Sequence, residues 1–144
     1  MELEKQVVNL ELSKRLKKLG VKQNSLFYWC EWTMDRITLE YVENPDDFVA
    51  ITGGSMDRFS AFTVAELGEM LPRSFDYEVS EFGVRDLIFS SGRTIIENNG
   101  WYVMYNDPHP SNKIPVYAQH ADTEANARAK MLIYLLENKL ITLN

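Results

Sequence analysis

Apolar residues recur at helical spacing near both ends of the chain. Close to the N-terminus they keep one face of a helix apolar from about Asn9 to Leu19, and Gly20 follows where a left-handed residue commonly ends a helix. The residues of this face are Val8, Leu12, Leu16 and Leu19. A longer helix is predicted from about Thr123 to Leu140. Its main apolar stripe consists of Ala125, Ala129, Leu132, Ile133, Leu136 and Leu140.

A third, shorter helix is predicted from its capping residues. Thr63 and Glu66 match a capping box, in which each side chain accepts a hydrogen bond from the other residue's backbone N–H. Phe62 and Leu67 occupy the positions of a hydrophobic staple, and Pro72 ends the helix soon afterwards.

Apolar and aromatic residues between the helices follow the pattern of strands. The aromatic run Leu26–Trp32 and the alternating residues 37–42 predict an antiparallel hairpin. Residues 44–60 read mostly as loop, with a short strand at 48–52 as an alternative.

The second half of the chain predicts a meander. Ser90-Ser91-Gly92 and Asn98-Asn99-Gly100 are typical turn sequences, so they divide the apolar segments into separate strands. The three predicted strands are residues 84–89, 93–97 and 101–105. The proline-containing segment 107–112 is predicted to be a loop, and 114–118 an edge strand.

These elements predict an α+β fold in a single domain over residues 1–144. We expect one antiparallel sheet of about five or six strands, formed by the hairpin and the meander, packed against the N-terminal and the long C-terminal helices.

The composition is that of a globular protein, with 45% hydrophobic and 25% charged residues. The single cysteine, Cys30, cannot form an internal disulfide, which suits a reducing compartment. The N-terminus lacks the pattern of a secretory signal, and no apolar stretch reaches the roughly 18 residues of a membrane span. We therefore expect a cytoplasmic protein without a membrane partner.

The chain carries a formal net charge of −6, but its bases are concentrated in the predicted first helix. Lys14, Lys17 and Lys18 form a candidate basic patch. Four aromatic residues that follow it could stack on bases: Phe27, Tyr28, Trp29 and Trp32. The acidic remainder would oppose binding to phosphates, so a weak nucleic-acid binder is kept only as an alternative.

Residues with catalytic chemistry do not form a recognisable motif. Cys30 lies in an aromatic strand with no base near it in sequence, as a buried structural cysteine does. His109 and His120 could bind a metal with Asp107 or Asp122, but their spacing matches no compact metal motif.

Acidic residues and glycines offer no stronger signal. Four acids lie in or near the first hairpin and could pair as general acid and base: Glu31, Asp35, Glu40 and Glu43. Gly53-Gly54-Ser55 lacks the frame of a phosphate-binding loop. No catalytic, cofactor-binding or metal-binding residue is therefore assigned, and a small hydrolase with an acidic or histidine-containing cleft is the enzymatic alternative.

The last helix has more apolar surface than a single stripe. Met131, Tyr134 and Leu135 lie away from the main stripe, so the helix is apolar over more than the one face that a surface helix needs. Burial inside the domain accounts for this pattern, and a partner interface, in a homodimer or with another protein, is the alternative.

Three segments carry a resemblance to known sequences: residues 16–29, 61–72 and 121–137. They resemble a family of short uncharacterised proteins from phages, prophages and other mobile elements. The resemblance implies no established reaction, ligand or site residue. It implies the context of an accessory protein. Together with the surplus apolar face around Tyr134 and the absence of a catalytic motif, this leads us to expect a non-enzymatic protein that acts through protein–protein interaction.

Overall fold

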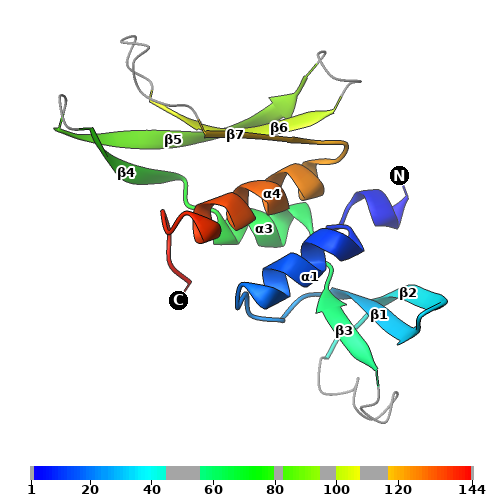
Figure 1. Ribbon diagram of the computed structural model, residues 1–144. Helices are drawn as coiled ribbons and strands as arrows, with labels where there is room; N and C mark the ends of the chain where they lie inside the picture. Colours follow the sequence, from blue (N-terminus) through cyan, green and yellow to red (C-terminus); the bar gives the residue numbers. More distant parts are fainter. Residues whose placement is uncertain (1, 45–55, 80–82, 95–99, 108–116, 144) are drawn as a thin grey trace.

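The structure is a computed structural model that describes residues 2–44, 56–79, 83–94, 100–107 and 117–143 (Figure 1). It is α+β, as the sequence predicts, with α1 (Leu10–Lys18), α3 (Val64–Met70) and α4 (Glu124–Glu137). A short 3-10 helix, η1 (Leu3–Lys5), precedes α1. No helix among the described residues has the length and apolar character needed to cross a membrane.

The prediction of one sheet is wrong, because the described strands form two. The first sheet has the order β2-β1-β3 and the second the order β4-β5-β6-β7, and every pairing is antiparallel. Figure 1 shows the two sheets at opposite ends of the molecule, with the helices between them. The strands of the first sheet are β1 (Phe27–Thr33), β2 (Arg36–Tyr41) and β3 (Asp57–Ser60). Those of the second are β4 (Ser74–Val79), β5 (Gly83–Arg93), β6 (Trp101–Asn106) and β7 (Tyr117–Ala121).

Local signals placed the helices and the first hairpin correctly. The capping box of Thr63 and Glu66 is present at the start of α3. At the end of α1, Gly20 has a φ of 88°, the left-handed conformation that glycine adopts without steric cost. Strands β1 and β2 pair as predicted, with Trp29 opposite Leu39.

The strand boundaries in the second half differ from the prediction. Ser90-Ser91-Gly92 is not a turn but the continuation of β5, because it pairs with Tyr102 and its neighbours in β6. The ring of Tyr102 lies so close to Gly92 that a Cβ there would meet its hydroxyl at 2.9 Å. Strands β3 and β4 lie where the sequence predicts no strand. Of the strand predicted at 93–97, Arg93 is the end of β5 and residues 95–97 lie outside the described residues, as do residues 48–52 and residues 108–112 of the predicted loop 107–112.

Helix α4 is buried on several sides. It packs against β6 and β7 on one side and against α3 and α1 on others. Eight of its fourteen residues are buried: Ala125, Asn126, Ala127, Ala129, Met131, Leu132, Ile133 and Leu135. The small alanine side chains let neighbouring elements approach the helix closely.

A polar contact fixes α4 against the start of α1. The buried Asn126 side chain accepts a hydrogen bond from the backbone N–H of Asn9 at 2.9 Å and donates one to Asp122 Oδ1 at 3.0 Å. The side chain of Asn9 in turn caps α1 by accepting a hydrogen bond from the N–H of Leu12. The first turns of the two helices are therefore joined through one asparagine.

We predict that Asn126→Ala lowers the free energy of unfolding by about 1–3 kcal/mol, because it leaves the Asn9 N–H without its partner in a partly buried place. Urea unfolding followed by circular dichroism measures the change. The exposed Asn24 is the control, and Asn24→Ala should change stability by less than about 0.5 kcal/mol. Equal effects of the two substitutions would contradict a structural role for Asn126.

Candidate functional site

Exposed apolar side chains gather around the three-stranded sheet. The described residues include seven large hydrophobic side chains classed as exposed, and five of these lie in or next to this sheet: Leu3, Leu26, Met34, Ile37 and Tyr41. Single exposed hydrophobic residues are ordinary on protein surfaces, but a contiguous group often marks an interaction site.

Two of the five, Ile37 and Tyr41, lie in β2 itself. Residues two apart in a strand share a face, so Ile37, Leu39 and Tyr41 point to the same side of the sheet. Tyr41 lies opposite Phe27, and their ring centroids are 5.5 Å apart. We call this face, with Leu3 of η1 beside it, the β2 surface; it consists of Leu3, Phe27, Ile37, Leu39 and Tyr41.

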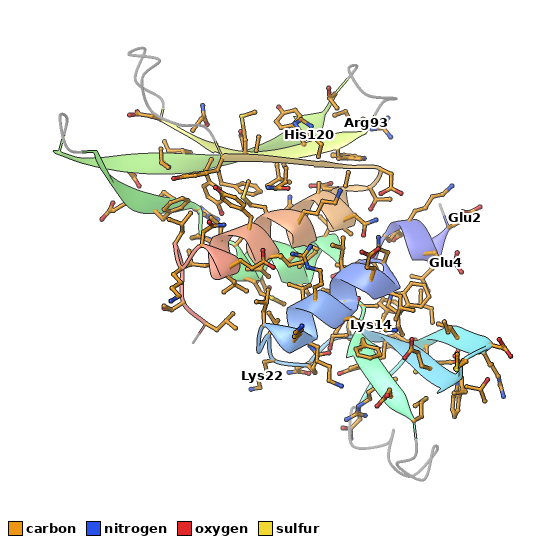
Figure 2. The ribbon with its side chains drawn as sticks, in the orientation of Figure 1. Glu2, Glu4, Lys14, Lys22, Arg93 and His120 are labelled. Atoms are coloured by element: carbon orange, nitrogen blue, oxygen red, sulfur yellow. The ribbon has the colours of Figure 1, made fainter. Side chains whose placement is uncertain are left out.

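A groove runs between η1 and the β2 surface. Its volume is about 540 Å³, and Leu3, Trp29 and Leu39 are among the residues that line it. Glu2 and Glu4 also line it, and Figure 2 labels both at the N-terminal segment, where Glu2 forms an ion pair with Lys5 at 3.1 Å. The groove is therefore apolar at its floor and acidic along one rim.

The β2 surface stays open because α1 covers the other part of the same sheet face. Lys14 and Lys17 of α1 lie over the ring of Phe59 in β3, at 5.4 and 4.8 Å from its centroid. The Trp29 indole N–H donates to the carbonyl of Val8 at 2.7 Å, which ties β1 to the segment before α1. No described residue covers β2 in this way.

The candidate basic patch is largely part of this helix–sheet contact. Lys14 forms an ion pair with Glu31, as Figure 2 places it between α1 and the sheet, and Lys17 donates to the carbonyl of Arg58 at 3.0 Å. Lys18 is exposed.

The neighbouring aromatic residues are also engaged. Tyr28 is buried, and the Trp32 indole N–H donates to Thr38 Oγ1 at 2.9 Å while the Arg36 guanidinium lies over its ring. With the Trp29 indole bonded to Val8, these rings are held within the fold, so the arrangement gives no support to base stacking beside a free basic face.

The surplus apolar face of α4 is inside the molecule. Met131 and Leu135 are fully buried, so neither can form a partner interface in this structure. Tyr134 is partly buried and packs against Tyr117 of β7, with ring centroids 5.5 Å apart. The partner interface expected at Met131, Tyr134 and Leu135 therefore loses its support from Met131 and Leu135, and Tyr134 is only partly covered.

Cys30 has the properties of a structural thiol. Its side chain is fully buried beside Tyr28, and burial raises the pKa of the thiol from 9.0 to about 11, with a smaller contribution from Glu40. A catalytic cysteine needs a lowered pKa. The only other described group whose pKa is clearly shifted is Tyr105, where burial also raises the pKa.

The remaining candidates do not come together. His120 is exposed on β7, at the opposite end of the molecule from the first hairpin, and His109 lies outside the described residues, as does Gly53-Gly54-Ser55 (Figure 2). Asp35, Glu40 and Glu43 are exposed, whereas Asp122 accepts a hydrogen bond from the N–H of Thr123 at 2.9 Å. Among the described residues, no three His, Cys, Asp or Glu side chains are placed to hold a metal ion.

A second pocket, of about 510 Å³, shares Leu3 and Phe27 with the β2 surface and extends to residues of α3, β5, β6 and α4. Its rim includes Arg93, which lies over the Trp101 ring, and Glu124, which forms an ion pair with Arg128 at 2.7 Å. The polar groups of Thr63 and Thr123 that reach it cap α3 and α4. These groups have structural partners, so the β2 surface is the stronger candidate site.

The sequence pattern predicts a strand at β2 but does not decide which side of it is exposed. The alternation of Ile37, Leu39 and Tyr41 was the available signal.

Comparisons with known proteins add no further assignment. No protein-family model matches the chain, and no curated protein or solved structure is significantly similar to it.

We predict that Cys30 reacts slowly with iodoacetamide in the folded protein. At pH 8, a pKa of about 11 instead of 9.0 lowers the thiolate fraction about a hundredfold, and the burial of the side chain slows labelling further. Mass spectrometry of native and urea-unfolded protein measures the two rates. Because the folded pKa is raised, the native rate should keep rising with pH up to about 11, and a plateau near pH 9 would contradict the assignment.

Proposed function

We propose that this chain is a non-enzymatic interaction module that binds protein through the edge strand β2. The observation that carries the proposal is the group of exposed apolar side chains on this strand, with Ile37 43% and Tyr41 59% exposed. An edge strand with an exposed apolar face is a site where another strand can add to the sheet.

The backbone of β2 supports this mode of binding. The N–H of Val42 donates to the carbonyl of Leu26, so the groups of Glu40 and Thr38 also point toward β1 in the alternating antiparallel pattern. The N–H and C=O groups of the residues between them point to the outer edge. They belong to Ile37, Leu39 and Tyr41, and no described residue pairs with this edge.

One strand thus offers main-chain hydrogen bonds and an apolar face together. Main-chain bonds supply affinity in strand addition, and the side chains on alternate positions supply specificity. The groove beside η1 extends the apolar contact.

The resemblance to proteins of phages and other mobile elements agrees with the proposal by association alone, through the context of an accessory protein. The enzymatic and nucleic-acid alternatives receive no comparable support. Burial is the largest cause of the raised pKa of both Cys30 and Tyr105, and two of the three candidate lysines are engaged with the sheet.

We predict that Ile37→Glu abolishes capture of protein partners, because it places a charge at the centre of the β2 surface. The tagged protein is used as bait in a nuclease-treated lysate of cells that naturally produce it, and bound proteins are quantified by mass spectrometry. Circular dichroism confirms that each variant is folded.

Ile88→Glu is the matched control. Ile88 is 44% exposed, almost the same as Ile37, but lies in β5 of the other sheet. A partner that is retained by Ile88→Glu and lost by Ile37→Glu assigns the interface to β2. If both variants capture the same proteins as the wild type, β2 is not the binding surface.

A further inference from the structure

The sequence of β2 is complementary to itself. Read from Arg36 to Tyr41 it is RITLEY, with a base and an acid four residues apart on one face and apolar residues on the other. We propose that the occupant of the β2 edge is the β2 edge of a second copy of this chain, paired antiparallel. This inference rests on the proposed function and names its partner.

The charges select one register. When two β2 strands pair antiparallel about Thr38, Arg36 of each copy lies directly opposite Glu40 of the other. Because the pair is symmetric, this contact occurs twice. Opposite charges at directly facing positions stabilise an antiparallel pair, and like charges destabilise it.

The backbone agrees with the same register. The outward N–H and C=O groups belong to Ile37 and Leu39, and these residues face one another across the proposed pair, so each pair exchanges both main-chain hydrogen bonds. Arg36 and Glu40 then fall at the positions without main-chain bonds, where facing side chains lie closest.

The apolar face is continuous in this arrangement. Ile37 of one copy lies beside Leu39 of the other, which covers side chains that the single chain leaves exposed or half-buried. The apolar faces of the two copies lie on the same side of the combined sheet, because the facing residues Ile37 and Leu39 both belong to the apolar face of β2. The two three-stranded sheets become one sheet of six strands with both apolar strips on one side.

The size of the contact sets its strength. A pair of six-residue strands buries less than the roughly 1,200 Å² of a standard stable interface, even with the η1 side chains added. We therefore expect a reversible dimer whose population rises with protein concentration.

The test is sedimentation velocity of the purified full chain over a series from micromolar to submillimolar concentration. The wild type should shift from monomer to dimer. Arg36→Glu and Glu40→Arg should each raise the dissociation constant at least about tenfold, because each turns two attractive pairs into two repulsive ones. An equimolar mixture of the two variants should dimerise again, since both facing pairs are then of opposite charge.

Arg73→Glu and Glu69→Arg are the controls, because they make the same charge changes at exposed positions outside the first sheet and should leave the dissociation constant unchanged. Misfolded variants could not dimerise again when mixed. Dimerisation of the mixture therefore keeps the test valid even if one of the variants is less stable.

Two results would overturn the inference. A wild type that is monomeric throughout the series excludes self-pairing, and a dimer that neither charge reversal weakens must form through another surface. Neither result decides the proposed function, because capture of a different protein that depends on Ile37 but not on Ile88 would still establish β2 as a binding edge.

Discussion

Helix α4 buries side chains around most of its circumference, and the positions of the other elements follow from what covers it. Strands β6 and β7 lie on one side, and α3 and α1 on others. A helix that is apolar over several faces must be enclosed to be stable. The four-stranded sheet alone covers only one face of α4, so α1 has to close another. The hydrogen bond from Asn9 to Asn126 fixes where α1 begins on this surface.

The position of α1 then determines which part of the first sheet is exposed. Its apolar residues Leu12 and Leu16 are buried in the same cluster as α4, so its lysine face turns toward β1 and β3. The helix has nine residues and is therefore only about 14 Å long. It covers Phe59 and approaches Glu31, but it does not extend over β2. The open β2 surface is thus a geometric consequence of closing α4.

Features that depend on neighbouring residues could be predicted from the sequence. The cap at Thr63, the left-handed Gly20 and the first hairpin each require only a few adjacent residues, and each is present. The division into two sheets could not be predicted. The first sheet is completed by β3, which has only four residues and whose strand conformation depends on its pairing with β1. The turn expected at residues 90–92 failed for a related reason. Small residues that favour a turn in isolation also leave room for the Tyr102 ring when they pair in a strand.

At the candidate site too, the sequence pattern predicts the local structure but not which surfaces the fold covers. The sequence identified the alternation in β2 and the surplus apolar face of α4, but it could not decide which of them is covered. Met131 and Leu135 lie outside the single apolar face that a surface helix needs, and the fold buries both of them. Ile37 and Tyr41 follow an ordinary strand pattern, and they are exposed because α1 covers β1 and β3 but not β2. Exposure of a given apolar face is set by how distant elements pack.

The charges on β2 limit how its exposed edge can pair with other strands. An apolar edge strand invites pairing with any extended chain, and natural proteins restrict such pairing with charged side chains. In RITLEY the restriction is selective. In a parallel pair in register, Arg36 of one copy would lie beside Arg36 of the other. In an antiparallel pair shifted by two residues from the register centred on Thr38, Arg36 would no longer face Glu40 of the other copy. A shift by one residue turns Ile37 and Leu39 to the face opposite their counterparts. Only the antiparallel register centred on Thr38 satisfies the charges, the main-chain bonds and the apolar face together, so the residues that limit unspecific pairing also define a specific one.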